Sequence, residues 1–273
     1  MKILSSKPIV EEFYASLDHK QIEKYHPHLA IITDDSNDSA NKIYINQKLK
    51  AAEKCGIRTS IYTVNSGLDY CYTIQKLLIN HDIHGIIVQQ PCKYASFDLV
   101  RNTVPRANDV DGFCADTLYA PCTPQGIITL LDYYKIEIAN KHCVVLGRSE
   151  IVGRPLARML LNRNATVSVC HSKTPIEMRD SLLSNADIVF CCTGVANLLR
   201  PGMVRNDAVI IDVGITRDEN NKLCGDAGHV EDWSATDVMI TPVPGGIGPM
   251  TVLSLMKNTI AAAKRFEEVH ICD

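Results

Sequence analysis

The stretch that decides the fold is Cys143-Val144-Val145-Leu146-Gly147-Arg148-Ser149-Glu150-Ile151-Val152-Gly153-Arg154-Pro155. Its β-branched start, followed by two glycines and a proline, predicts a strand, a tight turn and a helix. Gly147 lets the chain leave the strand sharply, Gly153 permits close packing where the helix begins, and Pro155 suits a first helical turn. Free N–H groups at such a helix start suit a pyrophosphate, although Ser149 stands where the usual dinucleotide fingerprint has its second glycine. The stretch predicts either a variant nucleotide-binding turn or a structural turn without a ligand.

Short β-branched runs alternate with amphipathic stretches on both sides of this turn. The predicted strands cover residues 29–33, 59–64, 85–89, 143–146, 166–170, 188–192, 209–213 and 238–240. The predicted helices cover residues 40–55, 68–80, 125–134, 153–163, 175–184 and 250–268. Strands and helices that take turns, with strands apolar on both faces, indicate an α/β fold with parallel sheets.

Residues 103–124 interrupt this alternation, because they combine prolines and polar residues without a clear period. We interpret this segment as the connection between two α/β lobes. The first lobe would cover residues 1–122, and the second, residues 123–249, would be a Rossmann-like nucleotide-binding domain.

Composition excludes several classes of protein. The chain has 273 residues and a formal net charge of −3, so it lacks the basic field that nucleic acid or an anionic membrane would require. Its apolar runs are of strand length, and its first residues lack the apolar stretch of a signal peptide. The 11 cysteines are scattered and include no Cys-x-x-Cys pair, which argues against a zinc site or a disulfide scaffold. We therefore expect no metal and a reducing, cytoplasmic location.

The end of the next predicted strand bears on which dinucleotide the turn would hold. An NAD-preferring site usually ends this strand with a carboxylate for the ribose 2′-OH. Here the strand is followed by His171-Ser172-Lys173, and Arg148 in the preceding turn could reach the same place. A hydroxyl and cations suit a 2′-phosphate and favour NADP, whereas the alternative is a solvated polar loop.

Two later segments fit a cofactor site. Cys192-Thr193-Gly194 ends a strand with a small, flexible turn, and residues 241–251 form a loop dense in glycine and proline that leads into the last helix. Proline fixes the backbone and glycine permits close approach, a useful combination beside a flat ring. The alternative is a structural crossover loop.

The first lobe carries its own candidates for chemistry. Tyr44 and Lys48 are four residues apart on a predicted helix and therefore share a face. Most Tyr/Lys pairs at this spacing are a solvated lysine over an aromatic ring and have no catalytic role. Gln89 ends an apolar strand, where open α/β sheets place ligand-binding groups, and Asp111 lies in a turn before Gly112. Short-chain dehydrogenases also use a Tyr-x-x-x-Lys spacing, but there it follows the nucleotide turn, whereas here it precedes that turn.

Together these motifs resemble the bifunctional methylenetetrahydrofolate dehydrogenase/methenyltetrahydrofolate cyclohydrolase family. The matching pieces follow the family's order over nearly the whole chain and are Tyr44-x-x-x-Lys48, Ala51 to Ile57, Val88-Gln89-x-Pro91, Asp109-Val110-Asp111-Gly112-Phe113, Pro121-Cys122-Thr123-Pro124, Gly147-Arg148-Ser149-x-Ile151-Val152-Gly153, Ala165 to Thr174 and Thr241 to Thr251. The resemblance implies lobes flanking a cleft, a final helix (residues 250–273) packed back on the first lobe, and a homodimer.

The resemblance also implies an activity. The enzyme would oxidise 5,10-methylenetetrahydrofolate with NADP and hydrolyse the methenyl product. Lys48 would be the acid/base group of the hydrolysis, Tyr44 would stack on the folate, Gln89 would hydrogen-bond near Lys48, and Asp111 would hold the pterin. The implied cofactor-binding residues are Gly147, Arg148, Ser149, Ser172, Thr193, Gly194, Ile215, Gly245 and Gly246, and Pro244 and Gly245 would also contact substrate.

The chain departs from the family pattern mainly in the first lobe. The departures are Asn41, Gln90, Cys92, Lys93, Asn108 and a short loop at residues 113–121. Two alternatives stay open beside the bifunctional enzyme. One is a dehydrogenase with weak or absent cyclohydrolase activity, and the other is a silent nucleotide-binding regulator.

Overall fold

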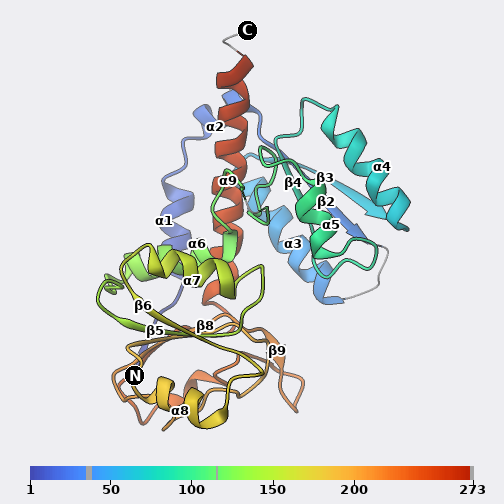
Figure 1. Ribbon diagram of the computed structural model, residues 1–273. Coiled ribbons are helices and arrows are strands. Elements are labelled where there is room, and N and C mark those ends of the chain that lie inside the picture. The colour runs from blue at the N-terminus through green and yellow to red at the C-terminus, as the bar shows by residue number, and fades with distance from the viewer. Residues whose placement is uncertain (35–38, 115, 271–273) are drawn as a thin grey trace. The chain divides into compact units, whose positions relative to one another are not determined.

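The computed structural model describes residues 1–34, 39–114 and 116–270, which divide into two compact units. Unit 1 contains Met1–Glu11 and Thr123–Thr251, and unit 2 contains Glu12–Cys122 and the chain from Val252 onward. The chain passes from one unit to the other within α1 (Lys7–Ala15), near the start of α6 (Cys122–Tyr133) and within α9 (Ile247–His270). The labels are those of Figure 1.

Unit 1 is built on a parallel sheet of six strands in the order β1-β11-β8-β7-β5-β6. The strands are β1 (Lys2–Ile3), β5 (His142–Leu146), β6 (Thr166–Cys170), β7 (Ile188–Cys191), β8 (Val209–Asp212) and β11 (Met239–Ile240). The other elements are α7 (Gly153–Leu161), α8 (Ile176–Ser184), a 3₁₀ turn at Val230–Trp233, and the two-stranded ribbon of β9 (Thr216–Arg217) and β10 (Leu223–Cys224).

Both faces of the unit 1 sheet are covered, which explains why its strands read as unbroken apolar runs. Along β5, Cys143 and Val145 join the core that α6 and α7 complete, whereas Val144 and Leu146 join the core that contains Leu183 of α8. Figure 1 shows α6 and α7 on one side of the sheet and α8 on the other. The α/β class and the parallel sheet predicted from the sequence are confirmed.

The N-terminal residues lie outside the unit to which the sequence assigns them. The sequence predicts residues 1–122 as one lobe, but β1 pairs with β11 in the unit 1 sheet, and Lys2 N donates to Val238 O at 2.8 Å. Residues 1–11 therefore belong to unit 1. The local sequence of a two-residue edge strand does not show which sheet it will join.

Unit 2 contains a parallel sheet of three strands in the order β3-β2-β4. Its elements are β2 (His28–Asp34), β3 (Arg58–Val64), β4 (Gly85–Val88), α2 (His19–Tyr25), α3 (Ser39–Lys54), α4 (Gly67–Leu78) and α5 (Phe97–Thr103). Along β2, Leu29 and Ile31 pack with α3 and α9, whereas Ala30 and Ile32 pack with α4 and α5.

The last helix contributes to the core of unit 2. Leu255, Met256 and Ala262 of α9 are buried in the same cluster as Leu29 and Ile31. The helix begins at Ile247, three residues before the predicted start, and the predicted residues 271–273 lie outside the described part of the chain. Within the described residues, no helix has both the length and the apolar character needed to cross a membrane.

Candidate active site

In unit 2, Lys48 and Gln89 come together although they are 41 residues apart. Lys48 lies on α3, one turn after Tyr44, and Gln89 follows directly after β4. Lys48 Nζ donates a hydrogen bond to Gln89 Oε1 at 2.9 Å, and Gln89 Nε2 donates to Gln90 O at 3.0 Å. Gln89 is only 8% exposed, so its amide holds the amine in one direction with little competition from water.

Asp111 belongs to the same neighbourhood. Burial raises the pKa of its carboxyl, and the positive charge of Lys48 opposes that rise. A hydrogen bond with the Cys122 thiol also favours the charged carboxylate. An amine, an amide and a carboxyl group therefore share one site.

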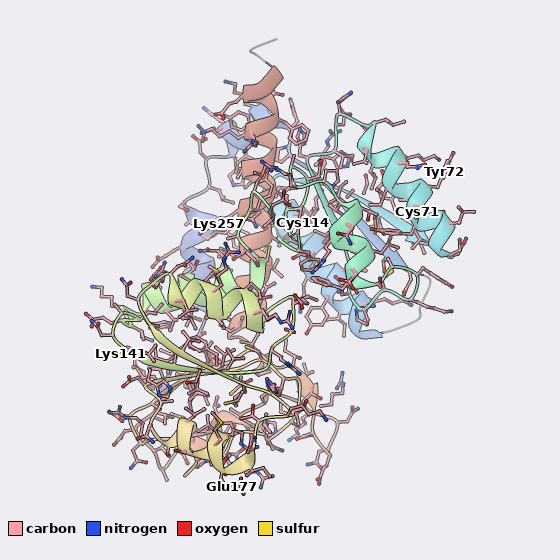
Figure 2. The ribbon with its side chains drawn as sticks, viewed as in Figure 1. Cys71, Tyr72, Cys114, Lys141, Glu177 and Lys257 are labelled. Atoms are coloured by element: carbon pink, nitrogen blue, oxygen red, sulfur yellow. The ribbon has the colours of Figure 1, made fainter. Side chains whose placement is uncertain are left out.

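The turn that carries Asp111 is held by the buried carboxylate of Asp109. Asp109 Oδ1 accepts from Gly112 N and Phe113 N, both at 3.1 Å, and Oδ2 accepts from Cys114 N at 2.8 Å. Cys114 is labelled in Figure 2. Gly112 has a φ of +79°, and a Cβ there would lie 2.6 Å from Pro121 Cα, so this turn requires glycine.

Tyr44 is half-buried, and burial raises the pKa of its hydroxyl. Because Tyr44 and Lys48 lie one turn apart on α3, the ring and the amine are on the same face of the helix. The ring can therefore cover one side of a flat ligand that the amine approaches.

Residues that depart from the family pattern have structural partners in unit 2. Asn41 is buried and its Nδ2 donates to Pro91 O at 3.2 Å, which ties α3 to the segment after Gln89. Asn108 Nδ2 donates to Ile83 O at 3.1 Å and thereby connects the Asp109 turn to the chain that leads into β4. These two departures support the site's framework.

Sequence reasoning missed Asn258, whose side chain reaches the Asp111 turn from α9. Its Nδ2 donates to Val110 O at 2.8 Å and to Ala120 O at 3.0 Å. A single polar residue within a helix does not reveal a partner 148 positions away in the chain.

In unit 1, the nucleotide turn has the predicted shape but a different hydrogen-bonding pattern. Gly147 has a φ of +108°, and a Cβ on Gly153 would overlap Gly147 O, so both glycines are required for the turn. Ser149 Oγ accepts from Val152 N at 3.2 Å and from Gly153 N at 3.3 Å, and Ser149 O accepts from Arg154 N at 3.0 Å. The expected free N–H groups are therefore already bonded, because a serine at the fingerprint's second-glycine position caps the helix itself.

Arg148 and Ser172 follow strand ends that are paired with each other. Leu146 at the end of β5 is in register with Cys170 at the end of β6, and Gly147 N donates to Cys170 O at 2.8 Å. Both side chains are exposed. No carboxylate occurs at residues 171–174, so a guanidinium and a hydroxyl stand where an NAD site would have an acid.

The loops after β7 and β8 carry Thr193, Gly194 and Ile215. Gly194 has a φ of +71° and a Cβ there would meet no atom within 4 Å, which leaves room for a ligand next to its backbone. Val195 and Ile215 expose 52% and 39% of their surfaces, an apolar character that suits a ring system.

Pro244, Gly245 and Gly246 lie in the loop between β11 and α9. The Val243–Pro244 peptide bond is cis, and Gly245 O accepts from Ser6 N at 3.0 Å and from Ser6 Oγ at 2.8 Å. Ser6, another residue that the sequence did not indicate, thus anchors this loop from the N-terminal segment.

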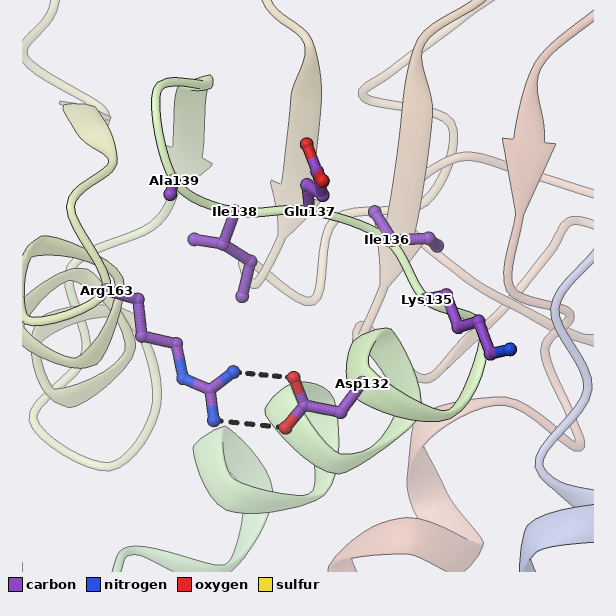
Figure 3. Close-up of a pocket in the computed structure, with 7 residues that line it drawn as sticks. All are labelled: Asp132, Lys135, Ile136, Glu137, Ile138, Ala139 and Arg163. Atoms are coloured by element: carbon purple, nitrogen blue, oxygen red, sulfur yellow. Dashed lines mark hydrogen bonds and ion pairs between the residues drawn. The ribbon is translucent and has the colours of Figure 1, made fainter.

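A hollow on the surface of unit 1 contains none of the candidate residues. It lies beside Asp132 and Arg163, whose side chains form two hydrogen bonds of 2.6 and 3.0 Å (Figure 3). The ion pair is partly exposed to solvent and lies on the surface of unit 1. Among the described residues, no group of three or more His, Cys, Asp or Glu side chains could hold a metal ion.

Comparison with protein families gives a match in both parts of the chain. Residues 4–111 match the catalytic domain of tetrahydrofolate dehydrogenase/cyclohydrolase, and residues 121–267 match its NAD(P)-binding domain.

Individual relatives agree with these matches. The chain is 44% identical over 251 residues to the bifunctional protein FolD of Campylobacter hominis, covering 87% of each chain. It is 39% identical over 275 residues to that of Lachnoclostridium phytofermentans, covering 96% of each.

Solved structures are similar as well. The bifunctional FolD methylenetetrahydrofolate dehydrogenase/cyclohydrolase of Campylobacter jejuni superposes with a TM-score of 0.89 at 35% identity, covering 97% of this chain and 99% of that one. The FolD of Trypanosoma brucei, solved with NADP and an inhibitor, superposes with a TM-score of 0.85 at 27% identity, covering 96% and 97%. The resemblance predicted from the motifs is confirmed: the chain belongs to the tetrahydrofolate dehydrogenase/cyclohydrolase family.

Proposed function

We propose that the chain oxidises 5,10-methylenetetrahydrofolate to the methenyl compound with NADP and then hydrolyses that compound to 10-formyltetrahydrofolate. The observation that carries this proposal is the hydrogen bond of 2.9 Å between Lys48 Nζ and Gln89 Oε1, with Asp111 in electrostatic contact. It lies in the part of the chain that matches the catalytic domain, and the other part matches an NAD(P)-binding domain.

The residues of unit 1 fit NADP. Arg148 and Ser172 follow adjacent strand ends and can both reach a 2′-phosphate, with no carboxylate at residues 171–174 to repel it. Gly147, Ser149, Thr193, Gly194, Ile215, Gly245 and Gly246 would line the rest of the cofactor. Because Ser149 occupies the amides at the start of α7, we assign phosphate binding mainly to side chains.

For the oxidation, NADP+ supplies the hydride acceptor when it is bound. The folate nitrogens stabilise the product cation with their lone pairs, so the protein's main task is to position the substrate. Tyr44 stacks on the folate, Asp111 holds the pterin through hydrogen bonds, and Pro244 and Gly245 contribute further substrate contacts.

The hydrolysis needs a group that moves protons. Water adds to the one-carbon bridge of the methenyl cation and loses one proton. One carbon–nitrogen bond then breaks as that nitrogen gains a proton and the hydroxyl loses its remaining proton to become the formyl carbonyl, so that one proton is released overall. Lys48 carries out these transfers, and Gln89 keeps its amine aimed at the bridge.

The decisive experiment supplies the purified protein with methylenetetrahydrofolate and either NADP or NAD, and follows methenyl formation and decay by absorbance. We expect the methenyl compound to form faster with NADP and then to be hydrolysed. Formation without decay would indicate the dehydrogenase alternative, and no reduction of either cofactor would indicate the silent regulator.

The phosphate assignment has its own test. Arg148→Ala and Ser172→Ala should each weaken NADP binding by about tenfold or more, because each removes a partner of the 2′-phosphate. The affinity for NAD should change little. Arg158→Ala, at an exposed position on α7, is the matched control. Equal use of NADP and NAD by the unchanged protein would contradict the assignment.

We also propose a homodimer in a reducing, cytoplasmic setting. β3 is an edge strand with Ile61 48% exposed, and such an edge suits pairing with a second copy. The ten cysteines of the described residues are all free thiols, as a reducing compartment would keep them. Sedimentation should show a dimer that Ile61→Lys weakens, and a monomer at micromolar concentration would contradict this.

A further inference from the structure

Two buried carboxyl groups lie behind the loop that carries Thr193 and Gly194. Asp212 ends β8 and is 2% exposed, and Asp226 follows β10 and is 0% exposed. Within the described residues, neither carboxyl forms a salt bridge with a lysine, arginine or histidine. Buried acidic groups without a cation are costly and call for a physical explanation.

The two carboxyls organise three loops. Asp212 Oδ1 accepts from Asp226 N at 3.0 Å and its Oδ2 accepts from Ala227 N at 2.7 Å, so the backbone after β10 wraps around Asp212. Asp226 Oδ2 in turn accepts from Thr193 N at 2.6 Å and from Thr193 Oγ1 at 2.7 Å. A single chain of contacts thus runs from β8 through Asp226 to the loop after β7.

The second oxygen of Asp226 is unusual. Asp226 Oδ1 is buried and has no hydrogen-bond partner. It lies so close to Gly214 that a Cβ on this residue would overlap it, and a Cβ on Gly225 would likewise overlap Asp212 Oδ2. Glycines at both positions let the backbone enclose the carboxyls.

Electrostatics agree with this geometry. Burial raises the pKa of Asp212 to about 7, backbone donors from Ala227 and Asp226 oppose the rise, and the charge of Asp226 adds to it. The titratable groups that face the pair are the thiols of Cys191, Cys192 and Cys224. Burial raises the pKa of each thiol, so the thiols stay protonated and add no negative charge beside the carboxyl groups.

We propose that Asp226, itself held by Asp212, is a positioning residue for the segment 193–195 that the proposed function assigns to the cofactor. Asp212 accepts from the backbone N–H groups of Asp226 and Ala227, which orients Asp226 so that its Oδ2 accepts both hydrogen bonds from Thr193. Thr193 Oγ1 also accepts from Val195 N at 3.2 Å, so the constraint extends along the loop to the exposed Val195. The inference rests on the proposed function, which assigns this loop to NADP.

Two substitutions at Asp226 separate shape from charge. Asp226→Leu removes the acceptor of both Thr193 donors, and the dissociation constant for NADP should rise about tenfold or more. Asp226→Asn keeps an acceptor oxygen, places a neutral amide where the unpartnered oxygen lies, and should bind NADP within about threefold of the unchanged protein. Asp237→Asn, at an exposed position before β11, makes the same charge change as a control.

The raised pKa of Asp212 gives a second readout that does not involve NADP. Because the pKa of Asp212 is raised from 3.8 to about 7 in the folded protein, its neutral form stabilises the fold at low pH. This stability is lost as the pH rises from about 4 to about 7, and Asp226→Asn should flatten that loss in the free energy of unfolding. Asp237→Asn should leave the pH profile unchanged.

The outcomes distinguish this inference from the proposed function. Hydrolysis of the methenyl compound, which is assigned to unit 2, should persist in Asp226→Leu, and only the affinity for NADP should change. Three results would each overturn the inference. The first is tight NADP binding by folded Asp226→Leu, and the second is a loss of NADP affinity in Asp226→Asn as large as in Asp226→Leu. The third is a pH profile of the free energy of unfolding that Asp226→Asn leaves unchanged. Failure of the unchanged protein to bind NADP would instead contradict the proposed function.

Discussion

Replacement of Lys48 by methionine removes the amine assigned to hydrolysis and keeps a side chain of similar length. The amine donates to Gln89 Oε1 at 2.9 Å, and Gln89 is 8% exposed. Lys48→Met should therefore have two separate effects, one on the reaction and one on stability.

The effect on the reaction follows from the loss of proton transfer. A positioned acid/base group contributes about 10²- to 10⁴-fold, so hydrolysis of the methenyl compound should fall by about that factor. The measurement is the decay of methenyl absorbance with purified protein. The dissociation constant for NADP should not change, because the cofactor-binding residues are assigned to unit 1.

The effect on stability follows from the acceptor that is left behind. Gln89 Oε1 loses its donor while buried, which costs about 1–3 kcal/mol in the free energy of unfolding. The double variant Lys48→Met/Gln89→Leu removes both partners and should recover part of this cost. Recovery is incomplete because the bond of 3.0 Å from Gln89 Nε2 to Gln90 O is lost too. Hydrolysis should stay low in the double variant.

Lys50→Met is the matched control, since Lys50 lies on the same helix at an exposed position. It should leave both hydrolysis and stability close to those of the unchanged protein. Near-normal hydrolysis by Lys48→Met, or an equal loss in Lys50→Met, would refute the reasoning.

Three further substitutions test other parts of the two units. Burial raises the pKa of Asp111, so its stabilising contribution is present at low pH and is lost as the pH rises through the folded-state pKa. In urea unfolding at several pH values, Asp111→Asn should lack this loss of stability. A pH profile of the free energy of unfolding parallel to that of the unchanged protein would contradict the prediction. Gly153→Ala should lower the free energy of unfolding by about 1–3 kcal/mol and weaken NADP binding, because the added Cβ would overlap Gly147 O. Gly248→Ala, whose Cβ would meet Ile215 Cδ1 at an ordinary 3.8 Å, is the control for calorimetry, and equal effects of both changes would contradict the overlap. Asn258→Ala removes hydrogen bonds of 2.8 and 3.0 Å from the Asp111 turn and should raise KM for the folate without changing NADP affinity; an unchanged KM in steady-state assays would refute this.

Much of the local structure was predictable because its signals lie close together in the sequence. β6 occupies the predicted residues 166–170, and α7 begins at the predicted Gly153. The short helix α5 was missed, since seven residues are too few for a clear period, although Ser96 caps it by accepting from Leu99 N at 3.2 Å.

The sequence predicted which residues form the candidate site better than it predicted their hydrogen bonds. Gln89 was expected near Lys48 by resemblance, and the structure supplies the hydrogen bond. The free amides expected at the start of α7 were a wrong prediction, because the spacing of Ser149 and Gly153 does not reveal that the hydroxyl turns back to cap the helix.

The sequence by itself determined that the chain alternates strands and helices in two α/β parts, that a glycine-bounded turn follows a buried strand, and that Tyr44 and Lys48 share a helix face. Each of these follows from residues within a few turns of one another. Only the tertiary structure decided that residues 1–11 belong to unit 1, that Asn258 reaches the Asp111 turn, and that Asp226 holds Thr193. These contacts join residues far apart in the chain, and burial of the surrounding apolar side chains, which has no local signature, selects them.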